Sequence, residues 1–295
     1  MPVLAGPLQA VAPGARRVVD ATLGHGGHAA LFLASGAEVL GVDRDPDALE
    51  IARHRLAGAA VTFLAGSFGD AAVHQAVVEF RPDFILLDLG VSSRQLDEDP
   101  RGFTFRPGAP LDMRMDRTGP TAADVLNTAD EAELTAIFRD FGDERRARGL
   151  AREVARRRTR APFAVSDDLV NAIRAVLGPQ SGAADFARLF QAVRIAVNGE
   201  LEVLERSLPL FRDALTPGGT LAVISYHSGE DRIVKRYFHE WARACVCPPE
   251  QPVCTCRGRP LGAAEPRRAI TADAAEIEAN PRSRSARLRI FRKAE

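Results

Sequence analysis

The chain has 295 residues, with 39 basic and 39 acidic side chains, so its formal net charge is zero and there is no overall basic field. Its 46% hydrophobic and 26% charged residues are typical of a globular protein. No apolar run approaches the roughly 20 residues of a membrane span, and no signal-peptide h-region opens the chain. We therefore expect a cytoplasmic protein outside the membrane, with one large domain plus an insertion.

The first motif is a glycine-rich loop between two apolar runs. The first run ends in Asp20, glycines follow within residues 24–27, and the second run ends in Asp43. This order is typical of a nucleotide-binding sheet, in which glycines let the backbone approach the ligand and the second carboxylate accepts ribose hydroxyls. NAD and S-adenosylmethionine both carry a ribose diol. The loop reads G-x-G-G, so a purely structural turn is the alternative.

Strands and helices alternate through the first 90 residues and resume near the C-terminus. Strands are expected at 17–20, 38–43, 61–65, 84–89, 220–225 and 286–291, the last of them at an edge of the sheet. Helices are expected between them at 48–56 and 70–80. Such regular alternation predicts an α/β fold with a parallel, doubly wound sheet.

The middle of the chain is predicted to be helical, without a strand-like run. The expected helices span residues 121–126, 131–141, 144–158, 166–177 and 190–208. We therefore expect a sheet domain in two parts, residues 1–105 and 189–295, that is interrupted by an all-helical insertion at residues 106–188.

The insertion contains a basic segment. Residues 139–160 hold nine arginines against four acidic residues, a net charge of +5. On the helix expected at 144–158, spacings of three and four residues place on one face Arg145, Arg148, Arg152 and Arg156. A solvated helix face is one interpretation of this pattern, and contact with a phosphate backbone is the other.

The cysteines form the next cluster. All four lie in two C-x-C pairs within one short segment, as Cys245, Cys247, Cys254 and Cys256. In a reducing compartment, paired cysteines indicate metal binding rather than disulfides. Four thiolates would form a closed tetrahedral zinc site, which is structural rather than catalytic. A redox-sensitive loop without metal is the alternative.

Two polar residues follow predicted strands and are candidates for catalysis. Asp88 ends an apolar strand and should lie at the carboxyl edge of the sheet, where ligands bind. A carboxylate there, with a backbone carbonyl, can accept from an exocyclic NH2 and raise electron density on its nitrogen. A helix cap or a cofactor contact without a chemical role is the alternative for Asp88. His227 follows the strand at 220–225 and would serve as a base, a stacking platform or an orienting group.

Motifs spread over nearly the whole chain resemble those of one enzyme family. They are DATLGHGGH (20–28), DRDP (43–46), LDLGVSS (87–93), RGF (101–103), LDMRMD (111–116), FQAVRI (190–195), HSGEDRIVK (227–235) and NPRSRSA (280–286). Taken together, they resemble the S-adenosylmethionine-dependent methyltransferases that act on N(4) of a cytidine in bacterial small-subunit ribosomal RNA, the RsmH (formerly MraW) family.

The resemblance implies a Rossmann-like methyltransferase sheet, and an inserted helical domain that helps to recognise the substrate. The implied cofactor is S-adenosylmethionine, with contacts from Gly26, Gly27, His28, Asp43, Phe68, Asp88 and Gln95. The candidate catalytic residues are Asp88 and His227. To the four arginines of the basic face, the C-terminal motif adds Asn280 and Arg284 as candidate RNA contacts. The implied substrate is a decoding-centre cytidine of 16S rRNA in the small ribosomal subunit, in single-stranded or locally opened form.

Two other functions are compatible with the same strand, glycine loop and second strand at the start of the sheet. A nicotinamide-dependent oxidoreductase would have a hydride-transfer site and no RNA affinity, and a non-catalytic ribosome-binding factor would bind the cofactor without turnover. The motif that begins at Asp88, the basic insertion and the joint family resemblance all favour the methyltransferase. The oligomeric state stays open between a monomer and a homodimer.

Overall fold

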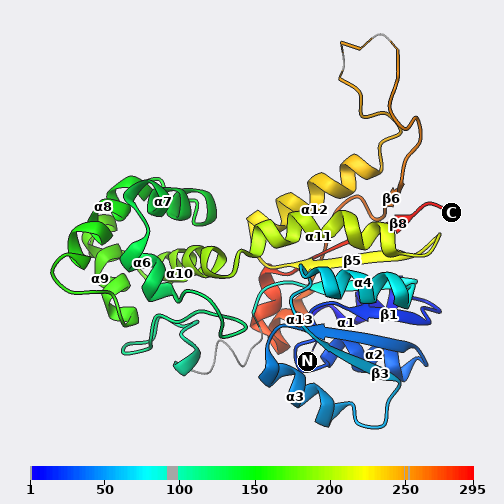
Figure 1. The fold of residues 1–295 in the computed structure, drawn as a ribbon, viewed down its shortest axis with the longest axis horizontal. Helices are drawn as coiled ribbons and strands as arrows, with labels where there is room; N and C mark the ends of the chain where they lie inside the picture. Colours follow the sequence, from blue (N-terminus) through cyan, green and yellow to red (C-terminus); the bar gives the residue numbers. More distant parts are fainter. Residues whose placement is uncertain (1, 92–98, 249, 252) are drawn as a thin grey trace. The chain divides into compact units, whose positions relative to one another are not determined.

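The computed structural model describes residues 2–91, 99–248, 250–251 and 253–295, and the chain divides into two compact units. The first joins Met1–Gly90 to Leu201–Glu295, and the second is Val91–Glu200 (Figure 1). The second unit is longer at both ends than the expected insertion, residues 106–188. The reason is that Phe103 before the first long helix and Leu189 on the last one both contribute to its hydrophobic core.

The first unit is built on one mixed sheet. Its strands are β1 (Arg17–Asp20), β2 (Glu38–Asp43), β3 (Val61–Ala65), β4 (Phe84–Asp88), β5 (Thr220–Ser225), β6 (Gly262–Ala264), β7 (Ile270–Thr271) and β8 (Arg287–Lys293). The order is β3-β2-β1-β4-β5-β8-β6, with β7 also paired to β8. Strands β1 to β5 pair in parallel, and β8 is antiparallel to β5.

Helices cover both faces of this sheet, which is the predicted doubly wound, Rossmann-like arrangement. One face carries α1 (Ala5–Val11), α2 (Gly27–Ala34) and α3 (Pro46–Arg55). The other carries α4 (Ala71–Phe80), α11 (Glu200–Ala214) and α12 (Ser228–Trp241), and Figure 1 shows α11 and α12 along β5. Neighbouring strand residues point to opposite faces, so Ile85 and Leu86 lie in different cores.

The prediction of an edge strand at residues 286–291 was wrong. Strand β8 pairs with β5 on one side and with β6 and β7 on the other, so it lies inside the sheet. Its alternating pattern arises because Leu288 and Ile290 face one core while Phe291 enters the other. The helical segments α13 (Ala274–Ala279) and η3 (Pro281–Ser285) precede it.

The second unit is helical, as expected, but some helix boundaries differ. It contains η1 (Asp99–Arg101), α6 (Ala122–Thr128), α7 (Glu131–Ala136), η2 (Ile137–Phe141), α8 (Ala147–Arg158), α9 (Ser166–Leu177) and α10 (Ala183–Asn198). The single helix expected at 190–208 is in fact two, α10 and α11. They separate at Gly199, which adopts a left-handed conformation (φ 60°) that glycine tolerates without strain. Helix α8 begins at Ala147 rather than at Glu144, because the Glu144 carboxylate accepts from the Arg146 N–H (2.7 Å) and holds a turn there.

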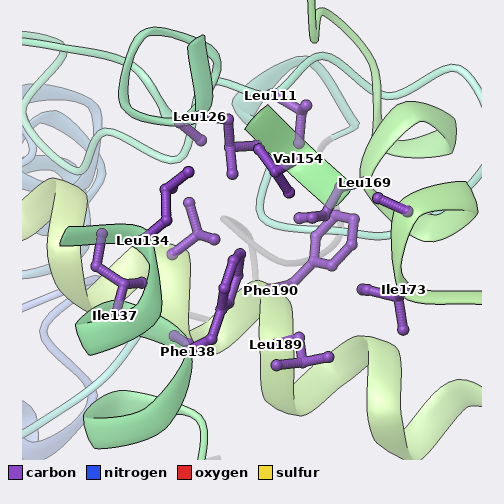
Figure 2. Packing of buried hydrophobic residues seen from close by; sticks show 14 of the residues in the cluster. Leu111, Leu126, Leu134, Ile137, Phe138, Val154, Leu169, Ile173, Leu189 and Phe190 are labelled. Atoms are coloured by element: carbon purple, nitrogen blue, oxygen red, sulfur yellow. The ribbon is translucent and has the colours of Figure 1, made fainter. Parts of the chain in front are cut away.

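This unit has a hydrophobic core of its own. Figure 2 shows side chains from different helices meeting in it, among them Leu134, Val154 and Phe190. All three are at most 4% exposed. Among the helices that the structure describes in either unit, none is long and apolar enough to span a membrane.

Candidate active site

Acidic residues end neighbouring strands at the same edge of the sheet. Asp20 ends β1, Asp43 ends β2 and Asp88 ends β4, and these strands are adjacent in the order β2-β1-β4. Because the strands are parallel, the three carboxyl groups share the carboxyl edge of the sheet, where ligands bind in open α/β folds.

The glycine loop is built around the Asp43 carboxylate. Its Oδ2 accepts from the Gly24 N–H (2.7 Å) and its Oδ1 from the Asp45 N–H (2.8 Å). Each carboxylate oxygen can accept a further hydrogen bond, so the group retains capacity for two ribose hydroxyls. Gly26 adopts a positive φ of 72°, and a Cβ there would lie 2.7 Å from the Leu56 side chain. The loop therefore requires glycine at this position.

Gly27 and His28 open helix α2, whose first N–H groups have no partner within the helix. This is the part of the loop that can receive a carboxylate of a ligand. The His28 side chain, by contrast, is only 6% exposed. Its Nε2 lies 2.8 Å from the Val3 carbonyl oxygen, and its Nδ1 lies 3.4 Å from Asp88 Oδ2.

The tautomer of His28 follows from these two contacts. A carbonyl oxygen only accepts, so Nε2 carries a hydrogen and Nδ1 faces the Asp88 carboxyl group. The imidazole is thus held between the Val3 carbonyl and the Asp88 carboxyl group.

Asp88 is held by two further residues. The Tyr226 hydroxyl donates to Asp88 Oδ1 (2.8 Å), and the Asp88 N–H donates to Thr22 Oγ1 (2.6 Å). Burial raises the pKa of Asp88, while His28 and the Tyr226 hydrogen bond act in the opposite direction. Its side chain nevertheless remains 22% exposed, so part of the carboxyl group is accessible.

Asp20 is the most deeply buried of the three carboxyl groups, at 1% exposure. Burial raises its pKa to about 7; His28 lowers this pKa and Asp88 raises it further. Its Oδ2 has no hydrogen-bond partner among the described residues. Burial also raises the pKa of Asp43, against the effect of its two backbone hydrogen bonds.

Tyr226 was not predicted from the sequence, although a signal for it exists. It directly follows β5, and β5 pairs with β4 so that Ile224 lies beside Asp88. Any residue just after β5 is therefore close to the end of β4. Sequence reasoning gave this position to the neighbouring His227.

His227 faces a different partner. Its Nε2 lies 3.2 Å from Glu230 Oε1, and the side chains of His227 and Glu230 are 11% and 3% exposed. The other oxygen of Glu230 accepts from the N–H groups of Tyr226 (2.8 Å) and His227 (3.3 Å). This arrangement fixes the turn between β5 and α12. It favours an orienting role for His227 over that of a base.

The remaining predicted cofactor contacts are Phe68 and Gln95. Phe68 lies in the loop after β3, partly buried, with its ring centroid 6.4 Å from that of Phe211. The loop begins at Gly66, whose N–H donates to the carbonyl of Asp43 (2.9 Å), so Phe68 and the ribose candidate lie on neighbouring loops. Gln95 lies outside the described residues.

The predicted basic face divides into paired and unpaired residues. Arg145 precedes α8, whereas Arg148, Arg152 and Arg156 lie on it, and all four side chains are exposed. Arg156 is bound through two hydrogen bonds by Glu153 (2.9 and 2.7 Å), and Arg152 lies 3.8 Å from Glu131. Arg145 and Arg148 make no ion pair within the part of the chain that the structure describes. Arg145 also lines a surface hollow formed by the loop before α8, the connection between α9 and α10, and the first turns of α10.

The two C-terminal candidates for RNA contact have different surroundings. Asn280 caps the η3 turn, where its Oδ1 accepts from the Arg282 N–H (3.3 Å). Arg284, on the same turn, is exposed. Asn280 therefore has a local structural role, and Arg284 presents a charge to the surface.

The cysteine segment lies between α12 and β6. The Sγ atoms of Cys245, Cys247, Cys254 and Cys256 all lie within 4.8 Å of one another. The two C-x-C pairs, nine residues apart at their centres, are thus brought together as the sequence pattern predicted.

Several motif residues outside the site have clear structural roles. A Cβ on Gly102, which has a φ of 72°, would lie 2.7 Å from the Asp112 backbone nitrogen, so the RGF motif packs directly against the LDMRMD motif. The Asn198 amide joins this loop by donating to the Met113 carbonyl (2.8 Å) and accepting from the Met115 N–H (3.0 Å).

A protein family and several named relatives match this chain over nearly its full length. The MraW methylase family matches residues 7–294. A protein of Gemmatimonas aurantiaca named ribosomal RNA small subunit methyltransferase H is 57% identical, over 100% of this chain and 95% of the relative. Proteins of the same name from Heliobacterium modesticaldum and Heliobacterium mobile are each 46% identical, over 93% of this chain and 91% and 92% of the relatives. The chain therefore belongs to the MraW methylase family.

Proposed function

We propose that this chain transfers a methyl group from S-adenosylmethionine to the exocyclic N(4) amine of a decoding-centre cytidine in 16S rRNA. Family membership makes the chain an rRNA methyltransferase. The observation that carries the finer proposal is the Asp88 carboxyl group, which is held by Tyr226 at the ligand-binding edge of the sheet. It is an acceptor suited to an amine N–H.

The residues at this edge fit S-adenosylmethionine. Asp43 would accept the two ribose hydroxyls, the first turn of α2 at Gly27 and His28 would receive the methionine carboxylate, and Phe68 would pack against the adenine. The Asp43 carboxylate and the glycine loop would suit NAD as well. Membership of a methylase family favours S-adenosylmethionine over NAD. When bound, S-adenosylmethionine supplies a methyl group activated by a sulfonium.

In this proposal Asp88 both orients the amine and holds its proton. A carboxylate that accepts one amine N–H draws electron density from that bond towards the nitrogen, which otherwise shares its lone pair with the ring. The raised pKa of Asp88 suits a group that takes up the proton the amine loses. Tyr226 and His28 keep the carboxyl group in one orientation meanwhile.

Substrate binding is assigned to the exposed arginines. Arg145 and Arg148 on the helical unit and Arg284 before β8 would contact phosphates, because their charges are presented to solvent. The target cytidine would be unpaired or locally opened, since a base within a helix cannot offer its amine to the protein. A ribosomal substrate also implies that the protein works in the cytoplasm.

The test compares Asp88→Ala and Asp88→Asn with the wild type in methyl transfer to small subunits that lack their native methylation. We expect both variants to lose most turnover and to bind S-adenosylmethionine at near wild-type affinity. Asp83→Asn, at the opposite end of β4, is the matched control and should keep its activity. Normal turnover of the Asp88 variants would rule out the proposed role, and a wild type that binds cofactor without transfer would indicate a non-catalytic factor.

A further inference from the structure

The described residues of the segment between α12 and β6 form no hydrophobic core. None of the described residues from 242 to 260 is buried, and Val253 is 68% exposed. Figure 1 shows the segment extending away from the sheet. Peptide segments without buried apolar surface need another source of order, such as a metal or a disulfide.

The distances between the four sulfur atoms distinguish these two sources. Cys254 Sγ lies 4.0 Å from that of Cys247, 3.7 Å from that of Cys245 and 3.5 Å from that of Cys256. Cys256 Sγ is 3.9 Å from that of Cys245. A disulfide requires ~2.05 Å. Zinc–sulfur bonds of ~2.3 Å in a tetrahedron place the sulfurs ~3.8 Å apart, which matches the observed spacing.

The backbone around the cluster also suits thiolate ligands. The Val246 N–H donates to Cys256 Sγ at 3.3 Å, which links the two C-x-C pairs. At the base of the segment, the Arg257 guanidinium donates to the carbonyl oxygens of Glu240 and Arg243. The two ends of the segment are thus joined by Arg257 and, directly beside it in the chain, by the four cysteines.

We propose that Cys245, Cys247, Cys254 and Cys256 bind one zinc ion, and that this ion holds the segment between α12 and β6 in its fold. Four thiolates fill the tetrahedral coordination shell, so the site has no open position for a substrate or a water molecule. The site is therefore structural. Zinc is favoured over other divalent ions because hard cations such as Mg²⁺ prefer oxygen ligands.

The first experiment measures metal in the full-length protein purified without chelators. We expect one zinc per chain by elemental analysis, and its loss in Cys254→Ser, the residue whose sulfur lies nearest to the other three. Thr255→Ser, between two of the ligands, is the matched control and should keep the ion. Replacement by Co²⁺ should give intense visible bands typical of a tetrahedral thiolate site. Iron in place of zinc, or no metal with either free thiols or disulfides, would overturn the proposal.

The second experiment needs no cysteine variant. Wild-type protein is stripped with a chelator under reducing conditions and digested with trypsin, which cleaves after Arg243 and Arg257 within the segment. We expect roughly ten-fold faster cleavage there without zinc and full protection after zinc is restored. Equal cleavage rates with and without zinc would contradict a role for the ion in holding the segment.

Discussion

The Tyr226 hydroxyl donates a 2.8 Å hydrogen bond to Asp88, although 138 residues separate them in the chain. The contact exists because β4 and β5 are parallel neighbours, so the residues that follow their carboxyl ends lie side by side. The helical unit is inserted between these two strands in sequence. The candidate site is therefore completed only when the chain returns to the sheet after the insertion.

Replacing Tyr226 with Phe removes this hydrogen bond and keeps the ring. Hydrogen bonds to charged groups contribute about 1.5–3 kcal/mol, so we expect kcat to fall by roughly 10- to 100-fold. The affinity for S-adenosylmethionine should change little. Tyr237→Phe removes the only other tyrosine hydroxyl and is the matched control. Equal kcat values for the two variants, measured on small subunits, would exclude Tyr226 from positioning Asp88.

Asp43→Asn tests the ribose contact. The amide keeps one oxygen acceptor for the loop and loses the charge, so we expect the Kd for S-adenosylmethionine to rise by roughly 10- to 100-fold. Isothermal titration measures this Kd, and a melting curve checks the fold. Glu50→Ala on the adjacent helix α3 is the control. An unchanged Kd would show that the ribose binds elsewhere.

The buried Asp20 predicts a pH dependence of stability. Its pKa is about 7 in the folded protein against an ordinary value of 3.8, so between these pH values the folded state retains a proton that the unfolded state has lost. The contribution of Asp20 to the free energy of unfolding is fully present below pH 3.8. It decreases by about 1.4 kcal/mol per pH unit as the pH rises towards 7. Asp20→Asn cannot ionise and should gain stability relative to the wild type between pH 5 and pH 8. Urea unfolding at both pH values measures this gain, and a constant difference would contradict the buried, protonated carboxyl group.

The exposed arginines predict a salt effect. Changing Arg145 and Arg148 together to Ala should weaken binding to small subunits and lower the slope of log Kd against log salt by about 1–2. Cofactor affinity should not change. Arg139→Ala is the control, because Asp140 already binds that guanidinium through two hydrogen bonds (2.7 and 2.8 Å). A slope equal to that of the wild type would remove these residues from the RNA surface.

The sequence predicted the parallel strands and the acidic strand ends because both depend on local patterns. Apolar runs that end in Asp20, Asp43 and Asp88 became adjacent strands with their carboxyl groups at one edge. The helical character of the insertion was equally clear, since α9 has the predicted bounds. Patterns of this kind need no knowledge of distant contacts.

Features that depend on distant contacts were not predicted. The strand at the C-terminus could be recognised, but its place inside the sheet depends on β6 and β7, which are too short to be seen in the sequence. The break at Gly199 lies within a continuous helical pattern. Tyr226 could be found only after β4 and β5 were known to be neighbours, which the intervening insertion conceals.

The central claim is methylation of a cytidine amine in small-subunit rRNA. The most direct test incubates the protein and labelled S-adenosylmethionine with small subunits that lack native methylation, and then separates the nucleosides of the 16S rRNA. The account predicts label in N(4)-methylcytidine, with little label when Asp88→Ala replaces the wild type. Label in any other nucleoside, or label that does not depend on Asp88, would contradict it.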